Sequence, residues 1–121
     1  MYKIVLIGVA GLVGTLSRYW LAGWVDARWD TRFPAGTLLV NLIGCFAIGF
    51  LVHAMEQKFI VDPDISAAIL VGLLGGFTTF SSFAVQTFNL LRGGEIFAAG
   101  SYLVLSNAGG LILVWAGYRL K

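Results

Sequence analysis

The sequence predicts an all-α integral membrane protein that crosses the bilayer four times. Of its 121 residues, 59% are hydrophobic and only 12% are charged, whereas soluble domains carry roughly 25% charged residues. The charges divide the chain into four apolar segments, each close to the roughly 20 residues with which a helix crosses a bilayer core. We therefore expect a single transmembrane domain over residues 1–121, with helices at approximately 4–25, 33–52, 65–91 and 96–118.

The first span is rich in glycine and contains one charge. Gly8, Gly11 and Gly14 recur every third residue, a pattern that favours close packing against another helix. Arg18 lies toward one end of the span, so its side chain can reach the interface or hold a loop carbonyl. A second interpretation places Arg18 in a vestibule, where a cation raises the local concentration of anions.

The second and fourth spans each carry a polar face. Thr37, Asn41, Gly44 and Cys45 fall on one side of the second helix. Asn41 is the carboxamide of that span, and a polar side chain there serves either a polar path or an interhelical hydrogen bond. In the fourth span a stripe of every fourth residue runs along one side of the helix, formed by Tyr102, Ser106 and Gly110.

The third span has the most unusual composition. Residues 65–91 carry no charge, yet their middle reads Gly75-Gly-Phe-Thr-Thr-Phe-Ser-Ser-Phe83. The glycine pair allows the backbone to leave helical geometry, and the hydroxyls offer it alternative hydrogen bonds. Non-helical backbone in a membrane is tolerated where it is buried in protein or lines a polar cavity. The pattern therefore predicts a helix that is broken in the middle of the membrane, at a transport site.

The charge and residue inventory excludes several functions. The acidic residues all lie in links or at span ends, whereas proton-coupled exchangers need an ionisable relay inside the membrane. This favours a passive path with an anion as its cargo. A single cysteine and a single histidine form no metal cluster, a base beside a nucleophile is not evident, and a basic stripe for nucleic acid is missing. We expect neither an enzyme nor a nucleic-acid-binding protein.

Basic residues are distributed almost equally between the two sides of the membrane. Four spans place both termini and the second link on one side, which then holds Lys3, Lys58, Arg119 and Lys121. The opposite side holds Arg28, Arg32 and Arg92, and Arg18 if its side chain extends that way. Orientation follows the Lys/Arg bias of short loops. The balance predicts insertion in both orientations and an antiparallel homodimer.

These motifs resemble the Fluc family of bacterial fluoride-specific ion channels. The resemblance covers nearly the whole chain and rests on Gly36-Thr-Leu-Leu-Val-Asn41-Leu-Ile-Gly44, on Gly75 to Phe83, and on Arg18 after a glycine-rich span. It implies a fluoride-selective passive channel that exports fluoride across the bacterial inner membrane, as an antiparallel homodimer with two pores. It also implies a structural sodium ion at the dimer axis, held by the backbone carbonyls of Gly75 and Thr78.

The same resemblance assigns the pore. Its aromatic residues map to Phe80 and Phe83, and its polar side chain in the second helix to Asn41. The hydroxyls of Thr79 and Ser82 are further candidates for contact with fluoride, and the hydroxyl track of the fourth helix maps to Tyr102 and Ser106. One departure is Gly110, which stands where the track would carry its next hydroxyl.

Two other functions fit parts of the pattern. A small dual-topology multidrug or guanidinium exporter matches the size and the charge balance, but it needs a glutamate embedded in the first helix, and this span has none. A non-transporting scaffold packed through glycines would leave the polar faces of three helices without a purpose.

Overall fold

The computed structural model describes residues 1–29, 33–57 and 62–120, and in these ranges every regular element is helical. The predictions that involve Arg32, Lys58 and Lys121 concern residues outside these described ranges. In chain order the elements are α1 (Tyr2–Arg28), α2 (Ala35–Glu56), α3 (Pro63–Ala67), η1 (Ala68–Leu74), α4 (Gly75–Phe77), α5 (Phe80–Arg92) and α6 (Ile96–Arg119).

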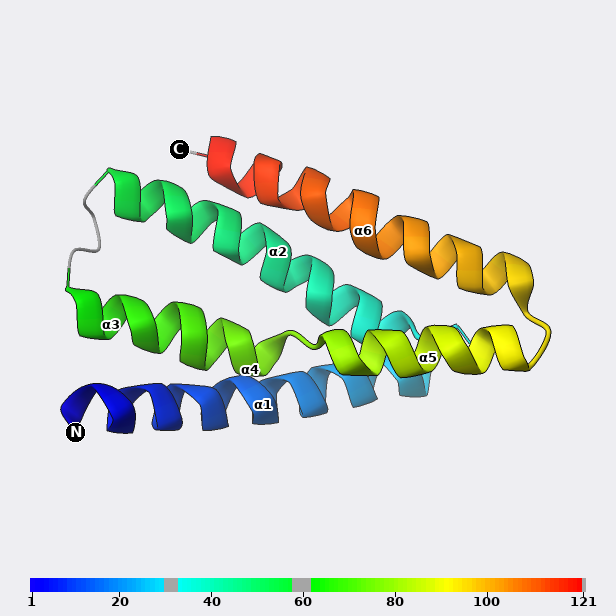
Figure 1. The fold of residues 1–121 in the computed structure, drawn as a ribbon, viewed down its shortest axis with the longest axis horizontal. Coiled ribbons are helices and arrows are strands. Elements are labelled where there is room, and N and C mark those ends of the chain that lie inside the picture. The colour runs from blue at the N-terminus through cyan, green and yellow to red at the C-terminus, as the bar shows by residue number, and fades with distance from the viewer. Residues whose placement is uncertain (30–32, 58–61, 121) are drawn as a thin grey trace.

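Four stretches are long and apolar enough to cross a membrane, as the sequence predicts. They are Tyr2–Arg28, Ala35–Glu56, Pro63–Arg92 and Ile96–Arg119. Each of these stretches ends at or beyond the last residue of the span that the sequence predicted. The start of α1, the end of α2, the start of α3 and the end of α6 lie at one end of the molecule, and the end of α5 and the start of α6 lie at the opposite end (Figure 1).

The third span contains a feature that its composition does not predict. Between α3 and α4, residues Ala68–Leu74 form a π-helix, η1, in which hydrogen bonds join residues five apart. Such segments are rare and frequently occur at functional sites. Here η1 immediately precedes the Gly75-Gly76 pair, so the span is already wider than an α-helix before it reaches its polar centre.

Glycines let α1 pack closely against η1 and α4. A Cβ added at Gly72 would lie 2.6 Å from the Ile7 carbonyl oxygen, and one at Gly76 would lie 2.7 Å from the Gly11 carbonyl oxygen. The close packing predicted for the glycines of the first span is confirmed at Gly14, where an added Cβ would collide with the backbone of Leu73. The same prediction is wrong at Gly8, where a Cβ would meet nothing within 4 Å, because that glycine faces away from the contact.

The second close contact joins α2 to α6. A Cβ at Gly49 would collide with the backbone of Val114, and one at Gly117 would collide with the backbone of Phe46. The two helices run side by side along much of their length (Figure 1). The chain thus consists of two closely packed helix pairs, α1 with the first half of the third span and α2 with α6, and the second half of the third span, α5, contacts α6.

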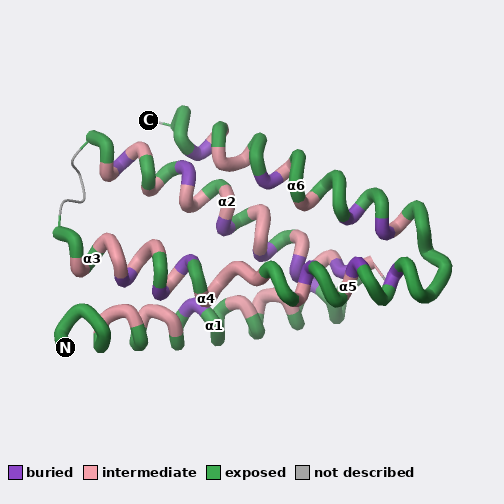
Figure 2. The backbone as a smooth tube through the Cα atoms, in the orientation of Figure 1, coloured by how far each residue is buried: buried purple, intermediate pink, exposed green. Residues whose placement is uncertain are grey.

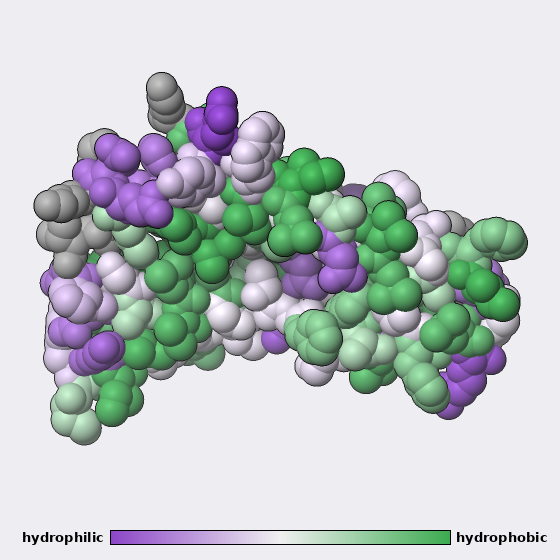
Figure 3. Space-filling view, turned by 45° about the horizontal axis from the view of Figure 1, so that its top comes forward, coloured by the Kyte–Doolittle hydropathy of each residue, from purple (hydrophilic) through white to green (hydrophobic). Residues whose placement is uncertain are grey.

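The outward faces of the helices are apolar. Large hydrophobic side chains such as Leu12, Trp20 and Leu111 are more than half exposed, and most of the tube in Figure 2 is exposed or intermediate. Hydrophilic residues gather at the two ends of the molecule, and one hydrophilic patch interrupts the hydrophobic surface between them (Figure 3). At the helix ends arginines stack on aromatic rings one turn earlier, in the pairs Arg28–Trp24, Arg92–Phe88 and Arg119–Trp115, a contact suited to the membrane interface.

Candidate functional site

The helical backbone of the third span is interrupted at Thr78 and Thr79, which we call the central break. Helix α4 ends at Phe77, and α5 begins at Phe80. Between them Thr78 (φ −95°, ψ 158°) and Thr79 (φ −150°, ψ 122°) have extended backbones. Both conformations are ordinary for non-glycine residues, so the break needs partners for its peptide groups and not a special backbone geometry.

Asn41 of α2 supplies two of these partners. Its Nδ2 donates to the Thr79 carbonyl oxygen at 3.0 Å, and its Oδ1 accepts from the Thr79 N–H at 2.9 Å. The carboxamide therefore pairs with one extended residue as a neighbouring β-strand would. Asn41 makes the interhelical bond that the sequence left open, and because Nδ2 carries two hydrogens, one N–H remains for another acceptor.

Arg18 of α1 holds the other side of the central break. Its Nε donates to the Gly76 carbonyl oxygen at 3.0 Å. This is the carbonyl anchor that the sequence offered as one account of Arg18, and it puts a positive charge where the helical segment ends with unpaired carbonyls.

Two backbone carbonyls at the central break lose their usual donors. In a continuous α-helix the Gly75 carbonyl would accept from the Thr79 N–H, and the Thr78 carbonyl from the Ser82 N–H. Here the Thr79 N–H donates to Asn41, and the Ser82 N–H donates to Thr79 Oγ1 at 3.3 Å. Carbonyl oxygens are ligands that hard cations prefer, so this pair fits the carbonyl-only metal site that the resemblance implies. Among the described residues, His, Cys, Asp and Glu side chains form no cluster that could hold a metal ion.

The hydroxyls of the third span are not equivalent. Thr79 Oγ1 accepts from the Ser82 N–H and donates to Ser82 Oγ at 3.2 Å, which caps the start of α5. Its proton is therefore already used. Ser82 Oγ accepts in that pair, and within the described ranges no hydrogen bond donated by Ser82 Oγ is found.

Four aromatic rings form a continuous row from the central break toward one end of the molecule. Phe80 and Phe83 have ring centroids 5.8 Å apart, Phe83 and Tyr102 5.1 Å, and Tyr102 and Phe33 5.6 Å. Phe80 is 80% exposed in the single chain, whereas Phe83 is buried and Tyr102 is fully buried. The row therefore starts on the surface and passes into the interior between α5 and α6.

Tyr102 has a partner that sequence reasoning missed. Its hydroxyl donates to Gln86 Oε1 at 2.8 Å, so the proton that the hydroxyl track would offer to an anion is bound to a carboxamide. Gln86 stands one helical turn after Ser82 in the uncharged span. A polar residue at that spacing is the signal that could have identified it.

Ser106 presents the opposite case. Its Oγ is buried and has no hydrogen-bond partner among the described residues, although buried hydroxyls in proteins are normally paired. It faces a cleft of about 480 Å³, which we call the central cleft, whose lining includes Asn41, Cys45, Thr79, Phe80, Phe83 and Ser106. The structure thus brings most of the predicted pore residues together, while Ser82, Tyr102 and the vestibule candidate Arg18 do not line this cleft.

Cys45 accounts for the departure at Gly110. A Cβ at Gly110 would lie 3.1 Å from Cys45 Sγ, so the thiol fills the space in which a side chain at position 110 would sit. A larger residue at either position would need the other to give way.

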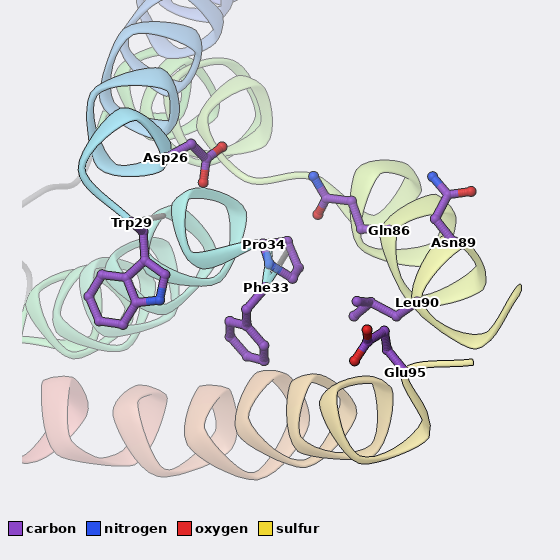
Figure 4. A pocket seen from close by; sticks show the side chains of 8 residues that line it. All are labelled: Asp26, Trp29, Phe33, Pro34, Gln86, Asn89, Leu90 and Glu95. Carbon is purple, nitrogen blue, oxygen red and sulfur yellow. The ribbon is translucent and has the colours of Figure 1, made fainter. Parts of the chain in front are cut away.

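A second cleft, the end cleft, has a volume of about 450 Å³ and lies where α1, α2, α5 and α6 approach one another. Its lining includes Asp26, Phe33, Gln86, Leu90 and Glu95 (Figure 4). Gln86 and Phe33 each also contact Tyr102, so the end cleft meets the aromatic row at its last ring.

The family model described as CrcB-like protein, Camphor Resistance (CrcB), matches residues 5–118. The chain belongs to this family. Relatives named "Fluoride-specific ion channel FluC" agree with it over nearly their full length. The protein from Pseudomonas fluorescens (strain SBW25) is 44% identical over 121 residues, covering 99% of this chain and 98% of the relative. That from Methylobacillus flagellatus is 41% identical, covering 99% and 94%.

Membership of the CrcB family confirms the resemblance that the motifs indicated. The CrcB relatives are named as ion channels and not as enzymes, which also confirms the expectation that the chain is no enzyme. Together with the four apolar spans, the family makes the chain a multi-pass membrane protein. The exporter interpretation has no support among these relatives.

Proposed function

We propose that this chain is a fluoride-selective passive channel that exports fluoride across the bacterial inner membrane. The choice of fluoride as the transported ion rests on the names of the relatives. Within the structure the strongest support is the buried Ser106 hydroxyl without a partner, in a cleft that it shares with Phe80 and Phe83. A buried donor without a protein partner, beside aromatic rings, is suited to bind an anion transiently during transport.

Some of the hydrogen-bond donors are available to bind fluoride, and others position the neighbouring side chains. Fluoride is small and holds its water strongly, so a selective path must replace that water with donors. The second N–H of Asn41 and the hydroxyls of Ser82 and Ser106 are available for this. The positive edges of Phe80 and Phe83 add attraction without a charge, and a narrow aromatic passage excludes chloride. Thr79 and Tyr102 act by positioning, because their protons are bound to Ser82 and Gln86.

The aromatic passage is tested by two substitutions. Phe80→Ile and Phe83→Ile are expected to abolish fluoride efflux from liposomes while the dimer persists. Phe97→Ile is the matched control, because Phe97 is 92% exposed at the start of α6. Undiminished efflux in both pore variants would contradict the role given to these rings.

We further propose an antiparallel homodimer with two pores, inserted in both orientations. Phe80 is 80% exposed in one chain, and a ring that lines a passage needs a second wall. The almost equal Lys/Arg counts of the two sides support insertion both ways. Adding two lysines to one side is expected to fix the orientation of tagged termini. Termini that already lie only in the cytoplasm would contradict the proposal.

A structural sodium ion is the third part of the proposal. The carbonyls of Gly75 and Thr78 from each of two chains would hold it, because their helical donors are bound elsewhere. When bound, the ion neutralises converging carbonyl dipoles at the dimer axis. In one chain a Cβ at Gly75 would lie an ordinary 3.8 Å from the Leu70 carbonyl oxygen.

That spacing makes Gly75→Ala a selective test, because the added methyl fits within the chain. The variant is expected to weaken the dimer and to remove its stabilisation by sodium over potassium, while the monomer fold remains. Gly76→Ala is the contrasting control, since its Cβ would crowd the Gly11 carbonyl at 2.7 Å and destabilise the chain in either salt. Because alanine keeps the backbone carbonyl and adds only a methyl, a Gly75→Ala dimer of normal strength that still depends on sodium would contradict a tightly packed sodium site between the two chains at this position.

A further inference from the structure

Phe33 occupies a defined position at the inner end of the aromatic row. Its ring lies nearly perpendicular to that of Tyr102, at 77° and 5.6 Å, and it packs against the buried cluster that contains Phe83 and Tyr102. Pro34 follows it directly, and the Ala35 N–H donates to the Phe33 carbonyl at 2.8 Å. Proline fixes its own backbone angle, so the turn that begins α2 also fixes where this ring sits.

Phe33 also lines the end cleft. Figure 4 shows it facing Leu90 and Glu95, whose carboxylate is directed toward the space, with Gln86 and Asp26 farther from Phe33 in this view. Tyr102 is fully buried and has Gln86 and Phe33 as contacts on the side of this cleft. Phe33 is thus the ring at which the aromatic row ends and the end cleft begins.

Among the described residues, the charged side chains that line the end cleft do not attract anions. Asp26 and Glu95 are both acidic, and Asp26 Oδ1 accepts from the Gly36 N–H at 2.8 Å, which satisfies part of its charge. Exposed charges are screened beyond roughly 8–10 Å at ordinary ionic strength. An anion that leaves Phe83 and Tyr102 for this cleft therefore needs a neutral, electropositive surface at the junction itself. The edge of an aromatic ring is such a surface.

We propose that Phe33 is a third aromatic residue of the fluoride path and helps to determine its specificity. The inference rests on the proposed channel function. The ring edge of Phe33 receives the anion after Phe83 and passes it to the end cleft beside Gln86, while Tyr102 positions both rings. Attraction to a ring edge requires close approach, so a larger anion such as chloride gains less from it.

The experiment separates the contribution of the aromatic ring of Phe33 to transport from the contribution of its side-chain packing to folding. Phe33→Met keeps an apolar side chain of similar bulk but has no ring, whereas Phe33→Tyr keeps the ring; Phe33→Leu is a second ring-free variant should the methionine impair folding. Phe97→Met is the control, because Phe97 is 92% exposed at the start of α6 and is not among the residues that line either cleft. Fluoride and chloride efflux from liposomes and the dimer content by size-exclusion chromatography are measured for each.

We expect ring-free variants to lower fluoride efflux about 2- to 12-fold, the range that an aromatic contact of ordinary strength supplies, with a smaller fluoride-to-chloride ratio and an intact dimer. Phe33→Tyr and Phe97→Met should resemble the unmodified protein. Unchanged efflux in an intact ring-free dimer, or equal loss in Phe33→Tyr and Phe33→Met, would overturn the inference. If Phe83→Ile abolishes efflux in the same series, the proposed function then stands; if the unmodified protein releases no fluoride, both fail.

Discussion

Removal of the Ser106 hydroxyl gives a prediction in which stability and transport change in opposite directions. Ser106 Oγ is buried without a partner, and a buried polar group left unpaired costs about 1–3 kcal/mol. Ser106→Ala removes that cost and leaves only a small void. The free energy of unfolding in detergent is therefore expected to stay unchanged or to rise.

Fluoride transport should fall in the same variant. A hydrogen bond to a charged group contributes roughly 1.5–3 kcal/mol, and since 1.36 kcal/mol is a factor of ten, loss of one such bond predicts roughly a 10- to 150-fold lower efflux. Efflux is followed with a fluoride electrode outside reconstituted liposomes, and unfolding by heating the purified dimer. Ser101→Ala is the control, because Ser101 lies on the same helix and is exposed.

Two results would refute this reasoning. Efflux from Ser106→Ala at the level of the unmodified protein would show that the hydroxyl does not contact the anion. A loss of efflux that merely follows a loss of folded dimer would show that Ser106 is structural and that its hydroxyl has a partner after all.

Three further substitutions test the framework of the central break. Arg18→Gln is expected to lower the free energy of unfolding by about 1.5–3 kcal/mol, because a charged donor to a helix-end carbonyl is lost; equal thermal stability would contradict this. Asn41→Asp keeps the hydrogen bond from the Thr79 N–H, but the carboxylate cannot donate and adds a negative charge. Fluoride efflux should therefore fall at least about tenfold (~1.4 kcal/mol). Efflux at the normal rate would contradict the role given to the paired hydrogen bonds between Asn41 and Thr79. Gly14→Ala places a methyl against the η1 backbone and should cost about 1–3 kcal/mol, whereas Gly8→Ala, with open space around it, should cost nothing measurable.

The sequence was sufficient for the spans and for several packing contacts. Twenty or so apolar residues between charged links can cross a bilayer only as a helix, so the four spans follow from composition. Gly72 and Gly76 lie on one face at a four-residue spacing, and that face does meet α1. The spacing of these glycines along the chain is therefore enough to predict which face of the third span packs against α1.

The roles of the polar side chains could not be predicted, because they depend on which partner uses each proton. The sequence left Asn41 open between a polar path and an interhelical bond, and it placed Tyr102 in a hydroxyl track, whereas in the structure Asn41 bonds Thr79 and Tyr102 donates to Gln86. The π-helical stretch Ala68–Leu74 is equally absent from the sequence pattern, since an apolar run has the same composition in either helix. Such features arise when helices dock, and no local signal precedes them.

Fluoride release from vesicles reconstituted with the purified protein, with chloride as the control ion, tests the central claim most directly. Passive release of fluoride, driven by its own gradient and independent of a pH gradient, with chloride retained, is the predicted result. Chloride release at a similar rate, or fluoride movement only when a proton gradient is imposed, would contradict a selective passive channel built around the central break.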